Sequence, residues 1–243
     1  MPSDPVETAH ALVRERFPDA VQAWLAGSVT TGRATATSDL DVTVLLGEGE
    51  VHRESLTYDG WPVELFVHTA ASVEHFVAKD LTRRRPTMAR LVATGVPLLG
   101  DGGDDVRRHC QDVLDAGPPP VPAADLELRR YGLTDLLDDL EHATDPGERL
   151  VIAATLWTNA AHGALVAANH WDGTGKWLLR ELRGLEENLD GDGGQGLADR
   201  WLAAHRDPAA IEAFAREVLD RLGGPLFDGY AAAAPRPDIT KPA

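Results

Sequence analysis

Residues 38–46 read SDLDVTVLL, and this stretch decides the fold of the N-terminal half. Side chains alternate across a β-strand, so the apolar residues at even positions from Leu40 to Leu46 share one face. The same alternation places Asp39 and Asp41 together on the opposite face. We therefore predict a buried strand that carries two carboxylates at its beginning.

A hairpin pattern follows the acidic strand. Residues 55–58 and 61–68 have strand patterns and flank the dipeptide Asp-Gly at 59–60, which is typical of a two-residue hairpin turn. In the returning strand Glu64 lies opposite the apolar face, and we expect it beside the first two carboxylates. Three carboxylates this close repel one another unless a cation lies between them. Mg²⁺ suits such a cluster because it takes oxygen ligands from few carboxylates and from substrate phosphates.

A glycine turn precedes the acidic strand. Residues 20–25 predict a short buried strand that ends at Gly27 and Ser28. Gly27 lets the backbone approach a ligand closely, and Ser28 adds a hydroxyl group. A turn of this kind at a strand end can hold phosphates through its N–H groups. Neither Gly-Ser nor Asp-x-Asp is informative alone, but their ordered combination with Glu64 predicts a phosphate and metal site.

At these residues the sequence resembles the nucleotidyltransferase superfamily that includes DNA polymerase beta. The resemblance rests on Gly27, Ser28, the SDLD stretch at 38–41 and Glu64. The strand that continues from SDLD looks typical of the antibiotic-modifying branch, and the two-part organisation is similar to aminoglycoside nucleotidyltransferases. The resemblance implies transfer of a nucleoside monophosphate from ATP or another NTP to a hydroxyl group, with release of pyrophosphate.

The resemblance also implies roles for the matched residues. Asp39 and Asp41 are expected to bind Mg²⁺, with two ions in the complete site. Many members carry Asp at the third acidic position, so the longer Glu64 is expected to be either a metal ligand or the general base. Related enzymes often place a lysine of the helical domain on the triphosphate. The expected nucleotide-binding residues are Gly27, Ser28, Ser38 and Lys176.

A proline-rich stretch marks the boundary between two domains. Four prolines fall within residues 116–124, which read AGPPPVPAA, and such a segment forms a semi-rigid linker. We predict a catalytic domain over 1–116, a linker over 117–122, a helical substrate-binding domain over 123–223 and a flexible tail over 224–243. The expected fold class is α+β, with a small mixed nucleotidyltransferase sheet and flanking helices followed by an all-helical bundle.

The charge balance bears on the partners. The net charge is −16, and both halves of the chain are acidic. Such a surface repels nucleic-acid phosphates and attracts cationic ligands, although solubility is an alternative reason for it. The helix after the linker carries Asp135, Asp138, Asp139 and Glu141, any of which could accept the proton of an acceptor hydroxyl. We take Asp135 as the candidate general base of this group.

We expect the acceptor to be a small cationic molecule with hydroxyl groups, and an aminoglycoside antibiotic fits best. One alternative is a protein-modifying (AMPylating) nucleotidyltransferase of the toxin–antitoxin type, but those lack a large helical domain like residues 123–223. Another alternative is a non-catalytic nucleotide-binding module, against which the complete acidic set argues.

Composition bears on compartment and assembly. A single cysteine excludes an intramolecular disulfide and a cysteine-based zinc cluster. The sequence has no apolar run of about 18 residues and no signal-peptide pattern at its beginning. We expect a cytoplasmic monomer or homodimer with no membrane partner.

Overall fold

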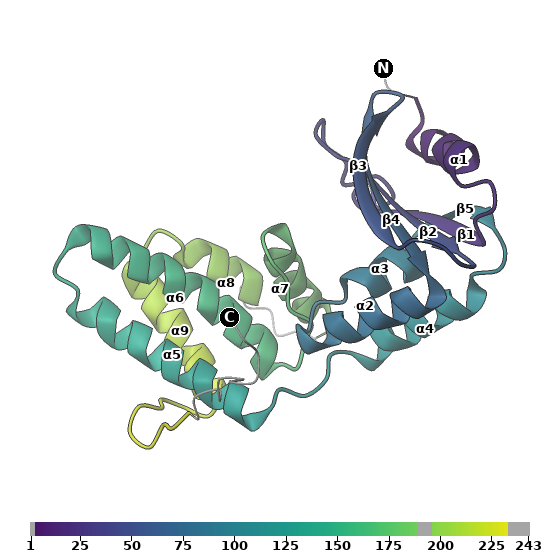
Figure 1. Cartoon of the computed structure of the whole chain (residues 1–243). Coiled ribbons are helices and arrows are strands. Elements are labelled where there is room, and N and C mark those ends of the chain that lie inside the picture. Colours follow the sequence, from purple (N-terminus) through teal and green to yellow (C-terminus); the bar gives the residue numbers. More distant parts are fainter. Residues whose placement is uncertain (1–2, 189–195, 233–243) are drawn as a thin grey trace, which may run out of the picture. The chain divides into compact units, whose positions relative to one another are not determined.

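The computed structural model describes residues 3–188 and 196–232, and the chain divides into two compact units, Met1–Pro118 and Pro119–Ala243. The first unit contains a five-stranded sheet with helices on both faces (Figure 1). In the second unit the regular elements among the described residues are helices. The expected α+β class, a mixed sheet followed by a helical bundle, is confirmed.

The sheet has the strand order β3-β4-β2-β1-β5. β2 and β4 are parallel, and every other neighbouring pair is antiparallel. In chain order the strands are β1 (Gln22–Ala26), β2 (Leu40–Leu46), β3 (His52–Tyr58), β4 (Trp61–Thr69) and β5 (Val96–Gly100). The sheet is therefore mixed, with β2 and β4 side by side near its middle.

Each face of the sheet is covered by its own helices and has its own hydrophobic core. The helices of this unit are α1 (Pro5–Arg16), α2 (Ala70–Thr82), α3 (Thr87–Ala93) and α4 (Asp104–Ala116). α1 packs on the face that carries Val42 and Leu65. α2, α3 and α4 build the second core, around Trp24 and Cys110, on the opposite face (Figure 1). The carboxylates of β2 and β4 belong to this second face because they alternate with Val42 and Leu65.

The beginning of α1 shows how local sequence sets an element. Asp4 accepts hydrogen bonds from the N–H groups of Val6 and Glu7, and Pro5 occupies the first turn, where its missing N–H costs nothing. The cap fixes where α1 begins before it crosses the sheet.

β3 is longer than the sequence pattern predicts. It begins at His52 rather than at residue 55, because residues 52–54 pair with β4 through their backbones. His52 and Arg53 are polar and exposed, so no alternation of apolar side chains indicates a strand there. The extension matters because it brings Arg53 onto the sheet, opposite Phe66 of β4.

The second unit consists of helices packed around α6. They are α5 (Ala123–His142), α6 (Pro146–Ala167), α7 (Lys176–Asn188), α8 (Leu197–Ala204) and α9 (Pro208–Arg221). Small residues on α6 let its neighbours approach closely, and a Cβ on Gly163 would lie 2.8 Å from the side chain of Val218 in α9. Trp157 and Trp201 stack with centroids 4.1 Å apart, and each indole N–H donates to the other residue's carbonyl.

α6 is also long and apolar enough to cross a membrane, judged by length and composition, with a mean hydropathy of 1.4. Within that window 44% of the helix is buried inside the structure. The central helix of a bundle has the same composition because it is apolar around much of its circumference. The property is therefore weak evidence for a membrane span.

The segment after α9, where the sequence predicts a flexible tail over 224–243, contacts α5. Arg130 of α5 donates hydrogen bonds to the carbonyls of Gly223 and Gly224. The ring of Tyr131 stacks on that of Tyr230, with 4.3 Å between centroids. Residues 224–230 thus contact α5 through bonds that the sequence does not indicate, and residues 233–243 lie outside the described part of the chain.

Candidate metal site

The three carboxylates predicted from the sequence come together in the first unit. Asp39, Asp41 and Glu64 each offer an oxygen, and these oxygens all lie within 4.8 Å of one another. All three side chains are half-buried. The arrangement concentrates three acidic groups in a volume that a single cation could reach.

The parallel pairing of β2 with β4 creates this arrangement. The register sets Asp41 directly beside Glu64 on the same face of the sheet. Asp39 immediately precedes β2, so it joins the pair from the end of the strand. The hydrophobic face of the same strands, with Val42 and Leu65 fully buried, anchors the register. A slip of one residue would bury the carboxylates.

Gly27 brings the backbone against the carboxylate of Asp41. Its φ of +88° lies in the left-handed region that favours glycine. A Cβ at this position would overlap Oδ2 of Asp41 and lie 3.1 Å from its Cγ. Both the conformation and the close contact require glycine, and they leave the turn's backbone beside the carboxylate.

The loop from Ser28 to Ser38 closes on itself beside this turn. The hydroxyl of Ser28 donates to Oγ of Ser38 at 2.8 Å, and Ser38 Oγ also accepts from the N–H of Thr35 at 2.8 Å. The N–H of Arg33 donates to the carbonyl of Ser28. The two serines predicted as nucleotide ligands therefore lie together, and here they bind each other. Their contact with a nucleotide stays a prediction.

Arg53 is part of the site, and the sequence reasoning missed it. Its Nη2 donates to both carboxylate oxygens of Glu64, at 2.7 and 2.6 Å. The guanidinium carbon lies 5.1 Å from the centre of the Phe66 ring, a cation–π distance. The 11-residue separation of Arg53 and Glu64 across a tight hairpin could have indicated that they are close. The strand predicted before the hairpin began at residue 55, so it did not include Arg53.

The residues fit a divalent cation of the kind the resemblance implies. Three carboxylate oxygens at mutual distances of 4.8 Å or less are hard donors of the type that Mg²⁺ prefers. In this structure the guanidinium of Arg53 supplies a positive charge to one of the three. A set of acids this close is stabilised by positive charge, and a divalent cation would add to what Arg53 supplies.

Asp135 and Lys176 belong to the second unit of the chain, whereas the residues of the cluster belong to the first. Asp135 is exposed on α5, and Lys176 is exposed at the first residue of α7. Their predicted roles as general base and triphosphate ligand stay predictions.

The second unit contains a histidine–aspartate pair that the sequence analysis did not predict. Nδ1 of His162 on α6 lies 2.6 Å from Oδ1 of Asp172, which is buried and also accepts from the N–H of Gly173. His162 lies on α6, whereas Asp172 lies in a loop. No periodic pattern links the two residues.

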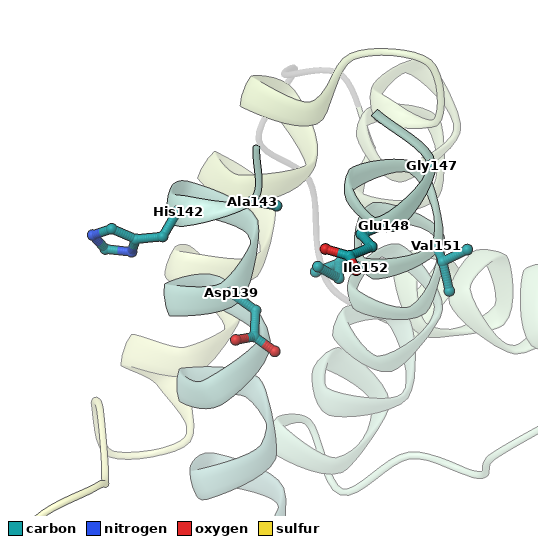
Figure 2. Close-up of a pocket in the computed structure, with 7 residues that line it drawn as sticks. All are labelled: Asp139, His142, Ala143, Gly147, Glu148, Val151 and Ile152. Atoms are coloured by element: carbon teal, nitrogen blue, oxygen red, sulfur yellow. The ribbon is translucent and has the colours of Figure 1, made fainter. Parts of the chain in front are cut away.

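Two cavities lie near acidic residues. One, of about 580 Å³, opens where α5 is joined to α6, and Figure 2 shows Asp139 and Glu148 among its lining residues. The other, of about 380 Å³, lies in the first unit and is lined in part by Arg53, Phe66 and His68. Arg53 therefore connects the acidic cluster to this second cavity, on the same face of β4.

Comparisons with known proteins add little to this geometry. No protein-family model matches the sequence, and no curated protein matches it. Among solved structures, the chain is similar to a nucleotidyltransferase-like protein from Exiguobacterium sibiricum, with a TM-score of 0.42 and 9% identity. The match covers 88% of this chain and 74% of the other. A likeness at this level carries no argument about function, so the case for a site rests on the residues themselves.

Proposed function

We propose that the protein is a nucleotidyltransferase that moves a nucleoside monophosphate from ATP or another NTP to a hydroxyl group of a small cationic molecule, with release of pyrophosphate. An aminoglycoside antibiotic is the proposed acceptor. The observation that carries the proposal is the convergence of Asp39, Asp41 and Glu64, whose oxygens lie within 4.8 Å of one another. The Gly27 turn lies directly against this cluster.

The carboxylate cluster and the Gly27 turn of the first unit have separate roles in this proposal. Asp39, Asp41 and Glu64 would hold Mg²⁺, which when bound supplies positive charge for the triphosphate and for the oxygens that carry charge during the transfer. The backbone at Gly27 permits close approach of the phosphates, and Ser28 can exchange its bond to Ser38 for one to a phosphate oxygen.

The second unit offers the remaining candidates. Lys176 is proposed to contact the triphosphate, and Asp135 is proposed to accept the hydroxyl proton. The acidity of the chain, −16 overall, supports a cationic acceptor, because it would raise the local concentration of a polyamine sugar.

The test is turnover with Mg²⁺ and each NTP across a panel of aminoglycosides and neutral drugs. Pyrophosphate release and the mass of the acceptor are followed together. We expect a cationic antibiotic to gain a nucleotidyl mass. Asp41→Asn should lower the rate by about 10³-fold, because loss of a metal ligand removes several kcal/mol of stabilisation and each ~1.4 kcal/mol is tenfold. Glu54→Gln removes a half-buried carboxylate of β3 that pairs with Arg16 on the face opposite the cluster, and it should retain activity.

The outcomes separate the competing functions. A nucleotidyl mass on a protein would favour the protein-modifying alternative, and nucleotide binding without turnover would favour a binding module. Full activity of Asp41→Asn would end the proposal. The affinity of a cationic acceptor, measured by calorimetry at two salt concentrations, should fall as salt rises, because salt screens the attraction. If the affinity does not depend on salt, the acidity of the chain no longer supports a cationic acceptor.

A further inference from the structure

Arg53 holds Glu64 from the outer edge of the sheet. Its Nη2 bridges both carboxylate oxygens at 2.7 and 2.6 Å, which is the short range of charge-assisted hydrogen bonds. The Arg53 side chain is 61% exposed, whereas that of Glu64 is 27% exposed. The guanidinium is thus an accessible group lying on a less accessible carboxylate.

Glu64 already has a cationic partner among the described residues. Three carboxylates lie together, and Arg53 is the cation joined to Glu64 by the ion pair of the described site. A divalent cation among the three oxygens would place two positive charges beside the same carboxylate. The guanidinium and the cation would then repel each other at short range, in half-buried surroundings where screening is weaker than in bulk water.

We propose that Arg53 is a positioning residue: its guanidinium is the counter-ion of Glu64 in the metal-free protein, and a divalent cation competes with it for this carboxylate. The inference rests on the metal site of the proposed function. It assigns to Arg53 the tasks of holding Glu64 in place before the metal binds and of weakening metal binding.

The Phe66 ring gives the Arg53 guanidinium an alternative contact when a cation binds Glu64. The guanidinium already lies 5.1 Å from the Phe66 ring centre, and the cavity that Phe66 lines begins there. A cation–π contact retains part of its stabilisation without the carboxylate. The exposed side chain can therefore leave Glu64 without entering an apolar core.

A neighbouring ion pair provides the matched control. Arg16 of α1 donates two hydrogen bonds to Glu54 of β3, at 3.1 and 2.8 Å. Glu54 follows Arg53 in the chain and points to the opposite face of β3. Arg16→Met therefore removes a similar arginine–carboxylate pair, whose carboxylate lies on the same strand as Arg53, and leaves the acidic cluster unchanged.

The experiment measures Mn²⁺ binding to the full chain by electron paramagnetic resonance, together with melting temperatures with and without Mn²⁺. Arg53→Met should bind Mn²⁺ at least fivefold more tightly than the wild type and melt lower without metal. Arg53→Lys keeps the charge and should stay within twofold of wild-type affinity. Arg16→Met should leave the affinity unchanged, whatever it does to the melting temperature.

The results distinguish this inference from the proposed function. If the wild type binds Mn²⁺ and Arg53→Met binds it equally or more weakly, the competition is refuted and the metal site stands. The neutral Arg53→Gln variant repeats the measurement should the Met variant fold poorly. If the wild type binds no more Mn²⁺ than Asp41→Asn does, the metal site and this inference both fall.

Discussion

Gly27 is the residue at which backbone conformation and the acidic cluster depend on each other. Its positive φ is one that residues with a side chain rarely adopt. The carboxylate of Asp41 occupies the space that a Cβ would need. Alanine there would strain the backbone and push the Asp41 carboxylate out of position. The turn and the cluster therefore share one steric requirement.

We predict that Gly27→Ala costs about 1–3 kcal/mol of stability and weakens Mn²⁺ binding at least tenfold. Gly60→Ala is the matched control, because Gly60 has a φ of +81° but no atom within 4 Å of a Cβ. It should be strained to a similar degree and still bind Mn²⁺ normally. Urea denaturation and calorimetry measure the two effects, and equal Mn²⁺ affinity in both variants would contradict the role of the Asp41 contact.

His68 on β4 makes stability depend on pH. Burial lowers the pKa of its imidazole below the ordinary value of 6.5, since the charged form loses hydration. As pH falls below 6.5 the unfolded chain takes up a proton that the folded chain does not, so the free energy of unfolding decreases. The loss from this residue is at most about 1.4 kcal/mol per pH unit.

We predict that His68→Gln flattens the dependence of unfolding free energy on pH between 7 and 5. Urea denaturation across that range measures the slope. His109→Gln, at an exposed position of α4, serves as the control and should follow the wild type more closely. Identical slopes for the wild type and His68→Gln would show that burial at β4 does not hold the imidazole neutral.

At the scale of elements, the first half of α6 contacts the core of the second unit on one side only. Leu156 is fully buried, whereas Leu150, less than two turns earlier, is 71% exposed. Leu156→Ala should lower the free energy of unfolding by about 2–5 kcal/mol, because it leaves a cavity. Leu150→Ala should change it by about 0.5 kcal/mol or less. Similar losses in both variants, measured by urea denaturation, would mean that another surface covers Leu150.

The beginning of β3 is an element boundary that the sequence pattern did not predict. The hairpin at 59–60 was predicted from its turn residues, and β4 from its alternation. The first three residues of β3 have no apolar face, and only their backbone bonds to β4 make them a strand. The position of Arg53 follows from those bonds, so its contact with Glu64 could not be predicted.

At the scale of the whole molecule, the acidic cluster belongs entirely to one unit. Asp39, Asp41, Glu64, Gly27 and Arg53 all lie within Met1–Pro118, which has its own hydrophobic cores. No chain segment of the second unit is needed to bring these five residues together. Metal binding should therefore be a property of the first unit alone.

We predict that a fragment of residues 1–118 folds and binds Mn²⁺ within threefold of the affinity of the full chain. Circular dichroism establishes whether the fragment is folded, and calorimetry measures the binding. Nucleotide transfer should be lost from the fragment if Asp135 or Lys176 takes part. A folded fragment that does not bind Mn²⁺ would contradict the assignment of the complete site to this unit.

The sequence by itself determined which side chains share a face of β2 and β4, because alternation along a strand is a local property of the backbone. It placed Asp39 and Asp41 on one face of β2 and Glu64 on the polar face of β4, and their convergence then required the parallel pairing of β2 with β4. Only the tertiary structure decided that Arg53 lies on Glu64 and that Ser28 bonds to Ser38. Those contacts join segments that loops and strand pairing bring together, and the final distances depend on packing that no spacing in the sequence records.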